Sequence, residues 1–210
     1  LCPVIAENGA MIIGSLAMVL LAAYICYIVH AVVVYSMAVK TMGGLSPLQF
    51  FKGMLPAIMF AFSSASSVGT LPINLECVEK LGSDREIASF VLPLGATINM
   101  DGTAIYQGVC AIFIASCYGI NLTLSQMLTV ILTATLASIG TAGVPGAGMV
   151  MLAMVLTSVG LPVDGIALVA GVDRIFDMGR TTVNITGDAS CSIIVSNLEK
   201  RREAKLAKKL

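Results

Sequence analysis

Long apolar runs, separated by short breaks of glycine, serine and proline, set the pattern of this sequence. The first run covers residues 10–40. Because about 20 apolar residues are enough to cross a bilayer, this run predicts one full transmembrane helix. Gly43 and Gly44 end the run, and Ser46 followed by Pro47 is typical of the start of the next helix.

Two later runs are interrupted halfway, which predicts helical hairpins. Residues 47–82 hold two short apolar arms joined by a serine-rich stretch at 63–72, and residues 122–160 repeat this plan around the glycine-rich stretch 138–148. Each arm is too short to cross a bilayer. Irregular backbone at membrane depth is tolerated only where it lines a protein-enclosed cavity, so we expect re-entrant hairpins. Whether the second tip moves as a gate or packs rigidly stays open at this point.

Two spanning helices complete the pattern. Residues 86–119 predict a transmembrane helix broken at Asn99–Thr103, and residues 163–198 predict the last transmembrane helix. A basic tail follows at 199–210 and favours a cytoplasmic C-terminus. Paired, interrupted apolar segments are typical of the binding region of secondary transporters. The sequence therefore predicts an all-α membrane protein with two re-entrant helical hairpins and broken transmembrane helices.

The composition excludes several other classes of protein. Only 11% of the 210 residues are charged and 57% are apolar, and 12 Lys and Arg balance 12 Asp and Glu. Soluble domains carry about 25% charged residues and nucleic-acid binders need a basic surface. The expected partner is therefore the lipid bilayer, and no nucleic acid is expected. No nucleophile–base pair, Cys/His metal cluster or phosphate-binding loop is evident in the sequence, which argues against an enzyme.

Polar side chains recur along the last predicted helix. They follow one another at intervals of four, three, four and four residues: Asp173, Asp177, Arg180, Asn184 and Asp188. At about 100° per residue they fall within an arc of roughly 80°. Each charge at the centre of a membrane helix costs about 2.5–3.5 kcal/mol on insertion scales, so this stripe must face a polar interior. It predicts a path for a ligand and ions, whereas an Asp177–Arg180 pair that serves packing alone is the alternative. Arg174, about 100° from Asp173, is left outside the stripe.

The break at Asn99–Thr103 predicts a cation site. Asn99 and Asp101 supply hard oxygen atoms, and interrupted helices leave backbone carbonyls free to coordinate Na⁺. The hairpin tips offer helix N-termini, which favour a substrate carboxylate. We interpret His30, the single histidine, as a packed or weakly bonded core residue rather than a proton carrier.

Four stretches together carry a family resemblance. They are the first tip ending in Gly69–Pro72, the break Asn99–Thr103, the second tip Gly140–Gly148 and the segment Asp177–Asn184. In this order they resemble the glutamate transporter family, the dicarboxylate/amino acid:cation symporters, and most of all its sodium-coupled acidic amino acid members. The resemblance covers essentially the whole chain.

The resemblance implies a fold and an assembly. It implies the transport-domain core of an elevator-type secondary transporter, within a multi-pass homotrimer of the plasma membrane that is built through scaffold helices. The scaffold helices would be missing from this chain, and residues 1–9 would be the end of the preceding scaffold helix and a loop.

The same resemblance implies residue roles. The implied substrate-binding residues are Ser67, Thr103, Val144, Gly148, Asp177, Arg180 and Asn184, with Arg180 on the side-chain carboxylate and Asp177 on the ammonium group. One implied sodium site consists of Gly95, Asn99, Asn184 and Asp188, a second of Thr97, Ser138, Ile139 and Thr141, and a third includes Asn99 and Asp101.

Three positions depart from the family pattern. Archaeal members carry Arg where this chain has Ala65, animal members carry Arg where it has Met178, and Val68 replaces a serine of the first tip. The resemblance leads to the hypothesis of sodium-coupled symport of aspartate or glutamate. Asp188 favours sodium over protons, because proton-coupled relatives tend to carry Asn at this position. The alternatives are a C4-dicarboxylate or neutral amino acid symporter of the same family or, from a different class, an anion channel or a non-transporting membrane receptor.

Overall fold

The structure is a computed structural model that describes the backbone of residues 2–207 and the side chains of residues 14–207. The described residues are helical, without a strand. The helical segments are α1 (Cys2–Val29), η1 (His30–Tyr35), α2 (Ser36–Ala38), η2 (Val39–Gly43), α3 (Pro47–Ser64), α4 (Ser67–Lys80), α5 (Arg85–Ile98), α6 (Asp101–Cys117), α7 (Leu124–Ser138), α8 (Ala147–Ser158), η3 (Val163–Gly165), α9 (Ile166–Ala170) and α10 (Asp173–Ala207).

The first helix is continuous from Cys2 to Gly43, where Gly44 ends it with a left-handed φ of 71°. Its η1 and η2 segments have the wider π-helical turn. The helix end and loop expected within residues 1–9 are therefore not found in residues 2–9, and Leu1 lies outside the described residues. Pro3 falls in the first turn, where a missing N–H costs nothing, so a helix forms there.

Two hairpins form where the sequence predicts them. Ser46 and Gln49 form a reciprocal cap at the start of α3, and Ala65, with a φ of 54°, ends it. Ser66 then caps α4, so only two residues connect the antiparallel arms. The second hairpin starts with the corresponding cap at Thr123 and has a longer tip, residues 139–146, between α7 and α8. Both hairpins therefore begin with a locally encoded helix start.

Two of the longer segments are interrupted. The backbone leaves the helical conformation at Asn99 and Met100, between α5 and α6, as the sequence predicts. The last segment, expected as one helix over 163–198, consists of η3, α9 and the much longer α10, which starts only at Asp173 and continues helically to Ala207. The chain turns between α9 and α10, so the polar stripe begins at a helix N-terminus.

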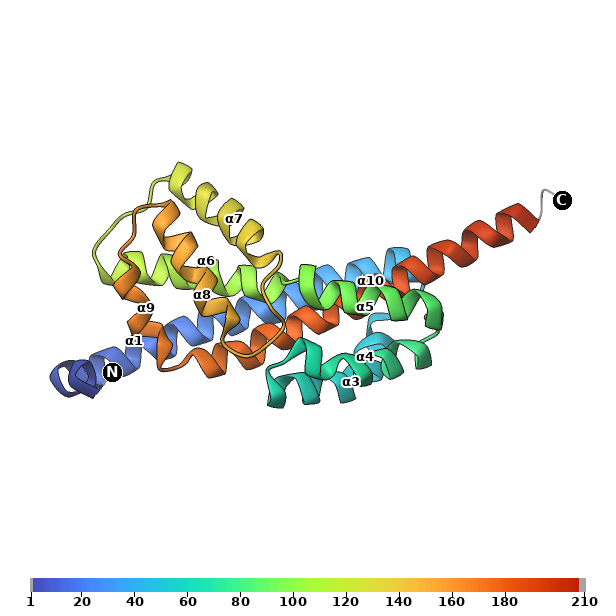
Figure 1. The fold of residues 1–210 in the computed structure, drawn as a ribbon, viewed down its shortest axis with the longest axis horizontal. Coiled ribbons are helices and arrows are strands. Elements are labelled where there is room, and N and C mark those ends of the chain that lie inside the picture. Colours follow the sequence, from blue (N-terminus) through green and yellow to red (C-terminus); the bar gives the residue numbers. More distant parts are fainter. Residues whose placement is uncertain (1, 208–210) are drawn as a thin grey trace.

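The helix α10 is the axis of the molecule. It runs beside the first helix along the long dimension, with the α3–α4 hairpin packed near its middle and the α7–α8 hairpin toward the N-terminal end (Figure 1). It contacts α1, α3, α4, α5 and α6. This arrangement brings both hairpin tips and the α5–α6 break to one stretch of α10.

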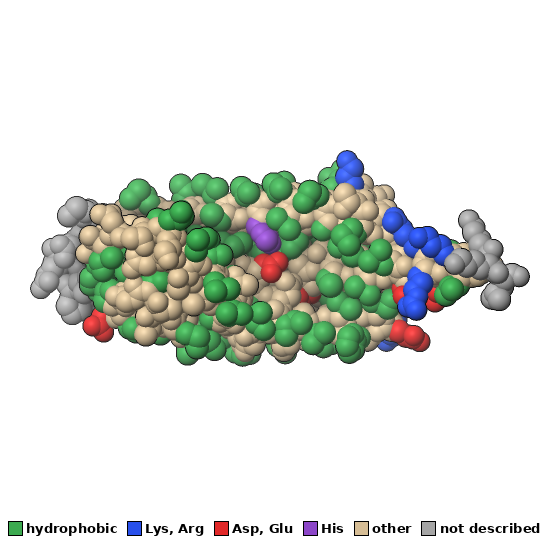
Figure 2. Space-filling view, turned by 90° about the horizontal axis from the view of Figure 1, so that it is seen from above, with side chains coloured by type: hydrophobic (Ala, Val, Ile, Leu, Met, Phe, Trp, Pro, Cys, Tyr) green, Lys and Arg blue, Asp and Glu red, His purple; other side chains and the backbone are tan. Residues whose placement is uncertain are grey.

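Much of the surface is apolar. Figure 2 shows hydrophobic side chains spread over one face, with Lys and Arg gathered near the C-terminal end. Among the described residues, Gly14–Gly43 and Arg85–Cys117 are long and apolar enough to cross a membrane by length and composition. Large exposed apolar faces are unusual on soluble monomers and indicate contact with lipid or protein.

Candidate functional site

A small cavity lies where the two hairpin tips meet α6 and α10. All seven residues predicted to bind substrate line it: Ser67, Thr103, Val144, Gly148, Asp177, Arg180 and Asn184. The remaining lining comes from Met100, Thr141, Ala142, Gly143 and Thr181. The cavity volume is about 10 Å³. That volume is about one water molecule, so the walls must separate before a larger molecule can enter.

Arg180 lies at the centre of the site and is almost completely buried. Its Nε donates a hydrogen bond to Asp177 Oδ1 over 2.8 Å, and its Nη1 lies 3.6 Å from Asp173 Oδ1. The guanidinium carbon lies 4.7 Å from the centre of the Tyr106 ring, a cation–π distance. A Cβ at Gly148 would collide with Nη1, so the absent side chain makes room for the guanidinium. Nη1 has no hydrogen-bond partner among the described residues.

Asp177 connects α10 to the second tip. Its Oδ2 accepts a hydrogen bond from the Gly146 N–H over 2.8 Å, while Oδ1 accepts from Arg180 and, at 3.4 Å, from Thr181 Oγ1. A guanidinium and a backbone N–H near the start of α8 thus bond to the same buried carboxyl group. The ion pair of α10 and the position of the second tip are thereby linked.

The two tips also contact each other directly. The carbonyl oxygen of Gly143 accepts hydrogen bonds from Ser66 Oγ at 3.1 Å and from the Val68 N–H at 3.2 Å. A Cβ at Gly143 would lie 2.9 Å from the Ala96 carbonyl oxygen, which is too close. Glycine at this position therefore allows the tips and α5 to come together.

Asn184 and Thr103 form the wall between the cavity and the α5–α6 break. Asn184 Oδ1 accepts from the Gly102 N–H at 2.8 Å, and its Nδ2 donates to Thr103 Oγ1 at 3.3 Å and to Met100 Sδ at 3.1 Å. A Cβ at Gly102 would collide with the backbone of Arg180. The break thus packs directly against the residue at the centre of the site.

The residues of the first predicted sodium site lie together. Asn99 Nδ2 donates to Asp188 Oδ1 at 2.8 Å and to the Asn184 carbonyl oxygen at 3.2 Å. A Cβ at Gly95 would collide with the Asp188 carboxylate, so Gly95 lies against it. These four residues come from α5, α10 and the break between α5 and α6, and the Asn99 amide nitrogen joins the buried Asp188 carboxylate to the Asn184 backbone carbonyl.

The residues of the second predicted site meet at the end of α7. The Thr97 carbonyl oxygen accepts from the Gly140 N–H at 3.0 Å, and the Ser138 carbonyl oxygen accepts from the Thr141 N–H at 3.1 Å. Ser138 and Thr141 are buried, whereas Ile139 and Thr97 are exposed. Because the α5 end and the α7 end are joined here, this group of carbonyls depends on the position of the second tip.

Asp101, of the third predicted site, has partners that the sequence did not indicate. Its Oδ2 accepts from Tyr35 Oη at 2.9 Å and lies 3.2 Å from His30 Nε2, and Tyr35 Oη also donates to the Val183 carbonyl oxygen at 3.2 Å. In an α-helix, residues 30 and 35 would be about 140° apart, but the π-helical turn directs both to one carboxylate.

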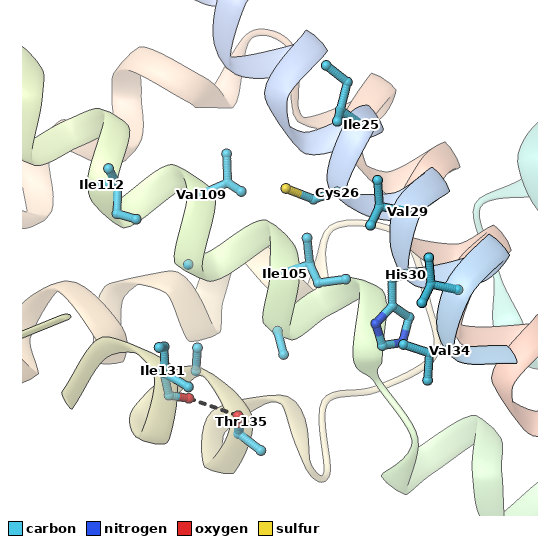
Figure 3. A pocket seen from close by; sticks show the side chains of 14 residues that line it. Ile25, Cys26, Val29, His30, Val34, Ile105, Val109, Ile112, Ile131 and Thr135 are labelled. Carbon is cyan, nitrogen blue, oxygen red and sulfur yellow. Dashed lines mark hydrogen bonds between the residues drawn. The ribbon is translucent and has the colours of Figure 1, made fainter. Parts of the chain in front are cut away.

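His30 is therefore more than a packed core residue. Figure 2 shows it beside an acidic side chain in the middle of an apolar face, and its side chain is 26% exposed. It also lines an apolar groove of about 620 Å³ between the first helix, α6 and α7 (Figure 3). The contact with Asp101 fits the weakly bonded form of the interpretation of His30, and its geometry depends on the π-helical turn, which is not visible in the apolar pattern.

The donor set matches hard cations rather than transition metals. Across the described residues, no group of three His, Cys, Asp or Glu side chains could hold a metal ion. The oxygen groups beside the Asn99 amide are the Asp188 carboxylate and the Asn184 backbone carbonyl, and hard cations prefer oxygen ligands of these kinds.

Two hairpin tips that close over a buried ion pair, beside an interrupted helix, define the class of a secondary transporter core. The model of the sodium:dicarboxylate symporter family matches residues 1–198, and the chain belongs to this family of transporters.

Similar proteins include excitatory amino acid transporter 1 of Rattus norvegicus, 44% identical over 195 residues, which are 92% of this chain and 36% of that protein. Over 156 residues, which are 74% of its length, this chain is 51% identical to an excitatory amino acid transporter of Caenorhabditis elegans and to excitatory amino acid transporter 2 of Mus musculus. These residues cover 31% and 27% of those proteins. The chain thus spans about a third of the length of the relatives it matches.

Proposed function

We propose that the protein containing this chain is a sodium-coupled symporter of an acidic amino acid, aspartate or glutamate. The observation that carries this proposal is Arg180, buried in a cavity between two hairpin tips with one guanidinium nitrogen lacking a hydrogen-bond partner among the described residues. A buried donor without a hydrogen bond is costly, and a carboxylate ligand would supply the charge-assisted bond that the 3.6 Å contact with Asp173 does not. The family membership and the names of the relatives support the same class of substrate.

The charges around Arg180 favour an amino acid over a simple dicarboxylate. Asp173 and Asp177 both lie near the Arg180 guanidinium, so two carboxyl groups share one cationic side chain. A side-chain carboxylate would bind Arg180, and an ammonium group would balance Asp177. Thr103 and Asn184 would donate and accept hydrogen bonds, while Ser67 and Val144 would offer backbone groups at the tips. Gly148 leaves the space that the guanidinium needs.

Sodium ions would couple through the oxygen groups that border this cavity. Asn184 belongs to the cavity wall and, through its carbonyl, to the group around Asn99 and Asp188. Ordering of that group by Na⁺ would fix Asn184 and thereby favour substrate binding. The coupling is reciprocal, so substrate would raise the affinity for Na⁺ by the same factor. The carbonyls near Ser138 and Thr141 would form part of a second sodium site. Asp101 and Asn99 would form part of a third.

Substrate entry would require the second tip to move. A cavity of about 10 Å³ is far smaller than an amino acid. Residues 139–146 are non-helical, and Gly140 and Gly146 have φ values of 83°, conformations that suit glycine. Opening would break the hydrogen bond from the Gly146 N–H to Asp177. The ammonium group of a bound substrate would then replace Arg180 as a partner of the Asp177 carboxylate and favour closure of the tip.

The membrane arrangement belongs to the proposal as well. The first helix, α5–α6 and α10 would span the plasma membrane, the α3–α4 and α7–α8 pairs would be re-entrant, and the basic end of α10 would be cytoplasmic. The chain would be the transport-domain core of an elevator-type homotrimer, with its apolar outer faces against lipid and scaffold helices.

Uptake by the complete gene product tests this function. Labelled aspartate, glutamate, succinate and serine are offered with and without Na⁺. We expect saturable, sodium-dependent uptake of aspartate or glutamate. Preferred uptake of succinate or serine would assign the related dicarboxylate or neutral amino acid function, and substrate-independent current would indicate a channel. Equal uptake in sodium-free buffer would contradict coupling.

The Arg180→Ala variant tests the observation on which the proposal depends. It removes the group that would bind the side-chain carboxylate, so kcat/KM for aspartate should fall at least about 100-fold. Arg201→Ala, at an exposed position near the C-terminal end of α10, is the matched control and should transport normally. Normal aspartate affinity in Arg180→Ala would contradict the assigned role.

A further inference from the structure

Arg174 connects the start of α10 to the tip of the first hairpin. Its Nη2 donates hydrogen bonds to the carbonyl oxygens of Ser63 at 3.0 Å and Ser64 at 3.2 Å. Those are the last two residues of α3. Arg174 therefore lies outside the polar stripe, as the helical spacing indicates, but it contacts an element of the site.

The two carbonyls are groups that the helix itself leaves without a partner. The last four carbonyls of an α-helix lack intrahelical donors, and the helix dipole places partial negative charge there. Ala65 ends α3 in the left-handed conformation, and the tip residues 63–70 have no charged side chain. A guanidinium suits this end because it supplies both charge and donors.

The base from which Arg174 extends is fixed. The neighbouring Ile175 carbonyl oxygen accepts a hydrogen bond from Tyr24 Oη at 2.7 Å, and Gly179, one turn further on, packs against the rings of Tyr24 and Tyr27. The start of α10 is thus held by the first helix. A side chain anchored in this way can fix the tip that it reaches.

The first tip is part of the cavity wall. Ser67 lines the cavity, and its neighbours Ser66 and Val68 bond to Gly143 of the second tip. Asp177 and Arg180 lie three and six residues after Arg174 on the same helix. We propose that Arg174 is a positioning residue that fixes the first tip against α10 and thereby sets the distance from Ser67 to Asp177 and Arg180.

This inference rests on the proposed function, since its consequence is measured on substrate affinity. Without the guanidinium, part of the binding free energy goes into ordering the tip. In Arg174→Met the KM for aspartate should therefore rise roughly tenfold while kcat changes less than about twofold. Arg174→Lys keeps one donor and the charge, so its KM should be intermediate. Lys52→Met, an exposed basic position on α3, is the matched control and should keep the wild-type KM.

Hydrogen exchange separates this inference from the proposed function. Amides of residues 62–70 should exchange faster in Arg174→Met than in the wild type, whereas those of α6 should be unchanged, whatever the protein transports. Absence of uptake by the wild type would refute the proposed function and leave this exchange comparison as the test. An unchanged KM in a folded Arg174→Met protein, or unchanged exchange at the tip, would overturn the positioning role. If Arg174→Met does not fold, Arg174→Gln replaces it, with at least a threefold rise in KM as the roughly expected result.

Discussion

Arg180 is surrounded by glycines as well as by charges. Gly148 faces its guanidinium and Gly102 faces its backbone, and a Cβ at either position would collide with Arg180. The two collisions differ in kind, because a guanidinium can rotate away but the backbone of a residue within α10 cannot. Space at single residues thus limits how the tip and the break approach α10.

Gly102→Ala should destabilise the protein by about 1–3 kcal/mol, because the added methyl group overpacks a rigid backbone contact. Gly108→Ala is the matched control on the same helix, since a Cβ there meets nothing within 4 Å, and it should be neutral or stabilising by up to about 1 kcal/mol. Thermal unfolding in detergent measures both. Equal stability of the two variants would show that α6 does not press on Arg180.

Asp188→Asn should weaken sodium binding. The carboxylate is buried beside Asn99 and Gly95, and an amide keeps the shape while removing the negative charge. The Na⁺ concentration for half-maximal uptake should rise about tenfold or more. Asp164→Asn, at an exposed position in η3, should leave it unchanged. The same sodium dependence in both variants would remove Asp188 from the site.

At the scale of elements, helix ends and irregular turns bring bonding partners to side chains of the candidate site. The α5–α6 break, the π-helical segment η1 and the non-helical second tip supply the groups around Asp101 and Asp177. Regular helices bond their own carbonyls and N–H groups, so free backbone groups for ions and substrate arise only where a helix stops. The loop between α4 and α5 is a further place where helices stop, and Ser196 and Lys200 of α10 bond to Asp84 in this loop.

Asp84 in that loop gives a pH-dependent contribution to stability. Hydrogen bonds from Lys200 and Ser196 lower the pKa of its carboxyl below the ordinary value. A carboxyl whose pKa is lower in the folded state stabilises the fold above the unfolded pKa of about 3.9, and this contribution is lost as the pH falls through the folded pKa.

Asp84→Asn should therefore lower the Tm at pH 6, and the difference from the wild type should shrink as the pH falls below about 4. Thermal unfolding across this pH range measures the effect. Glu203→Gln, on the exposed last turns of α10, should show no such pattern. A difference in Tm that persists unchanged at low pH would contradict the assignment to ionised Asp84.

At the scale of the whole molecule, the two tips and α10 form one connected unit. Gly143 receives two hydrogen bonds from the first tip, Gly146 donates one to Asp177, and Arg174 donates to the carbonyl oxygens of Ser63 and Ser64 at the end of α3. Movement of the second tip must break the first two of these connections. Binding in the cavity is thereby linked to the arrangement of both hairpins.

Aspartate with Na⁺ should protect residues 139–148 from hydrogen exchange, because bound substrate would hold the second tip closed. The amides of residues 81–85, in the α4–α5 loop, are the internal control and should not change. Mass-spectrometric exchange with Na⁺ alone and with both ligands measures the effect. Equal exchange at the second tip in all conditions would contradict its role as a gate.

The sequence by itself determined the breaks, the hairpins and the polar stripe. Glycine favours turns, so the second tip is visible in the local sequence, with Gly140 and Gly146 in the left-handed region. The break at Asn99 is visible instead as polar side chains inside an apolar run. The stripe from Asp173 to Asp188 follows from the helical repeat, and all five of its members are buried. Family motifs added the seven cavity residues, which indeed line one cavity.

Only the tertiary structure decided which of these features meet. The apolar pattern does not indicate that His30 and Tyr35 bond to Asp101, that Gly143 joins the two tips, or that Arg174 reaches the end of α3. These partners are 66 or more residues apart in the chain. Contacts over such separations depend on how helices pack and on local departures such as the π-helical turn. Periodicity along the chain records which face of a helix is polar, and packing decides what that face touches.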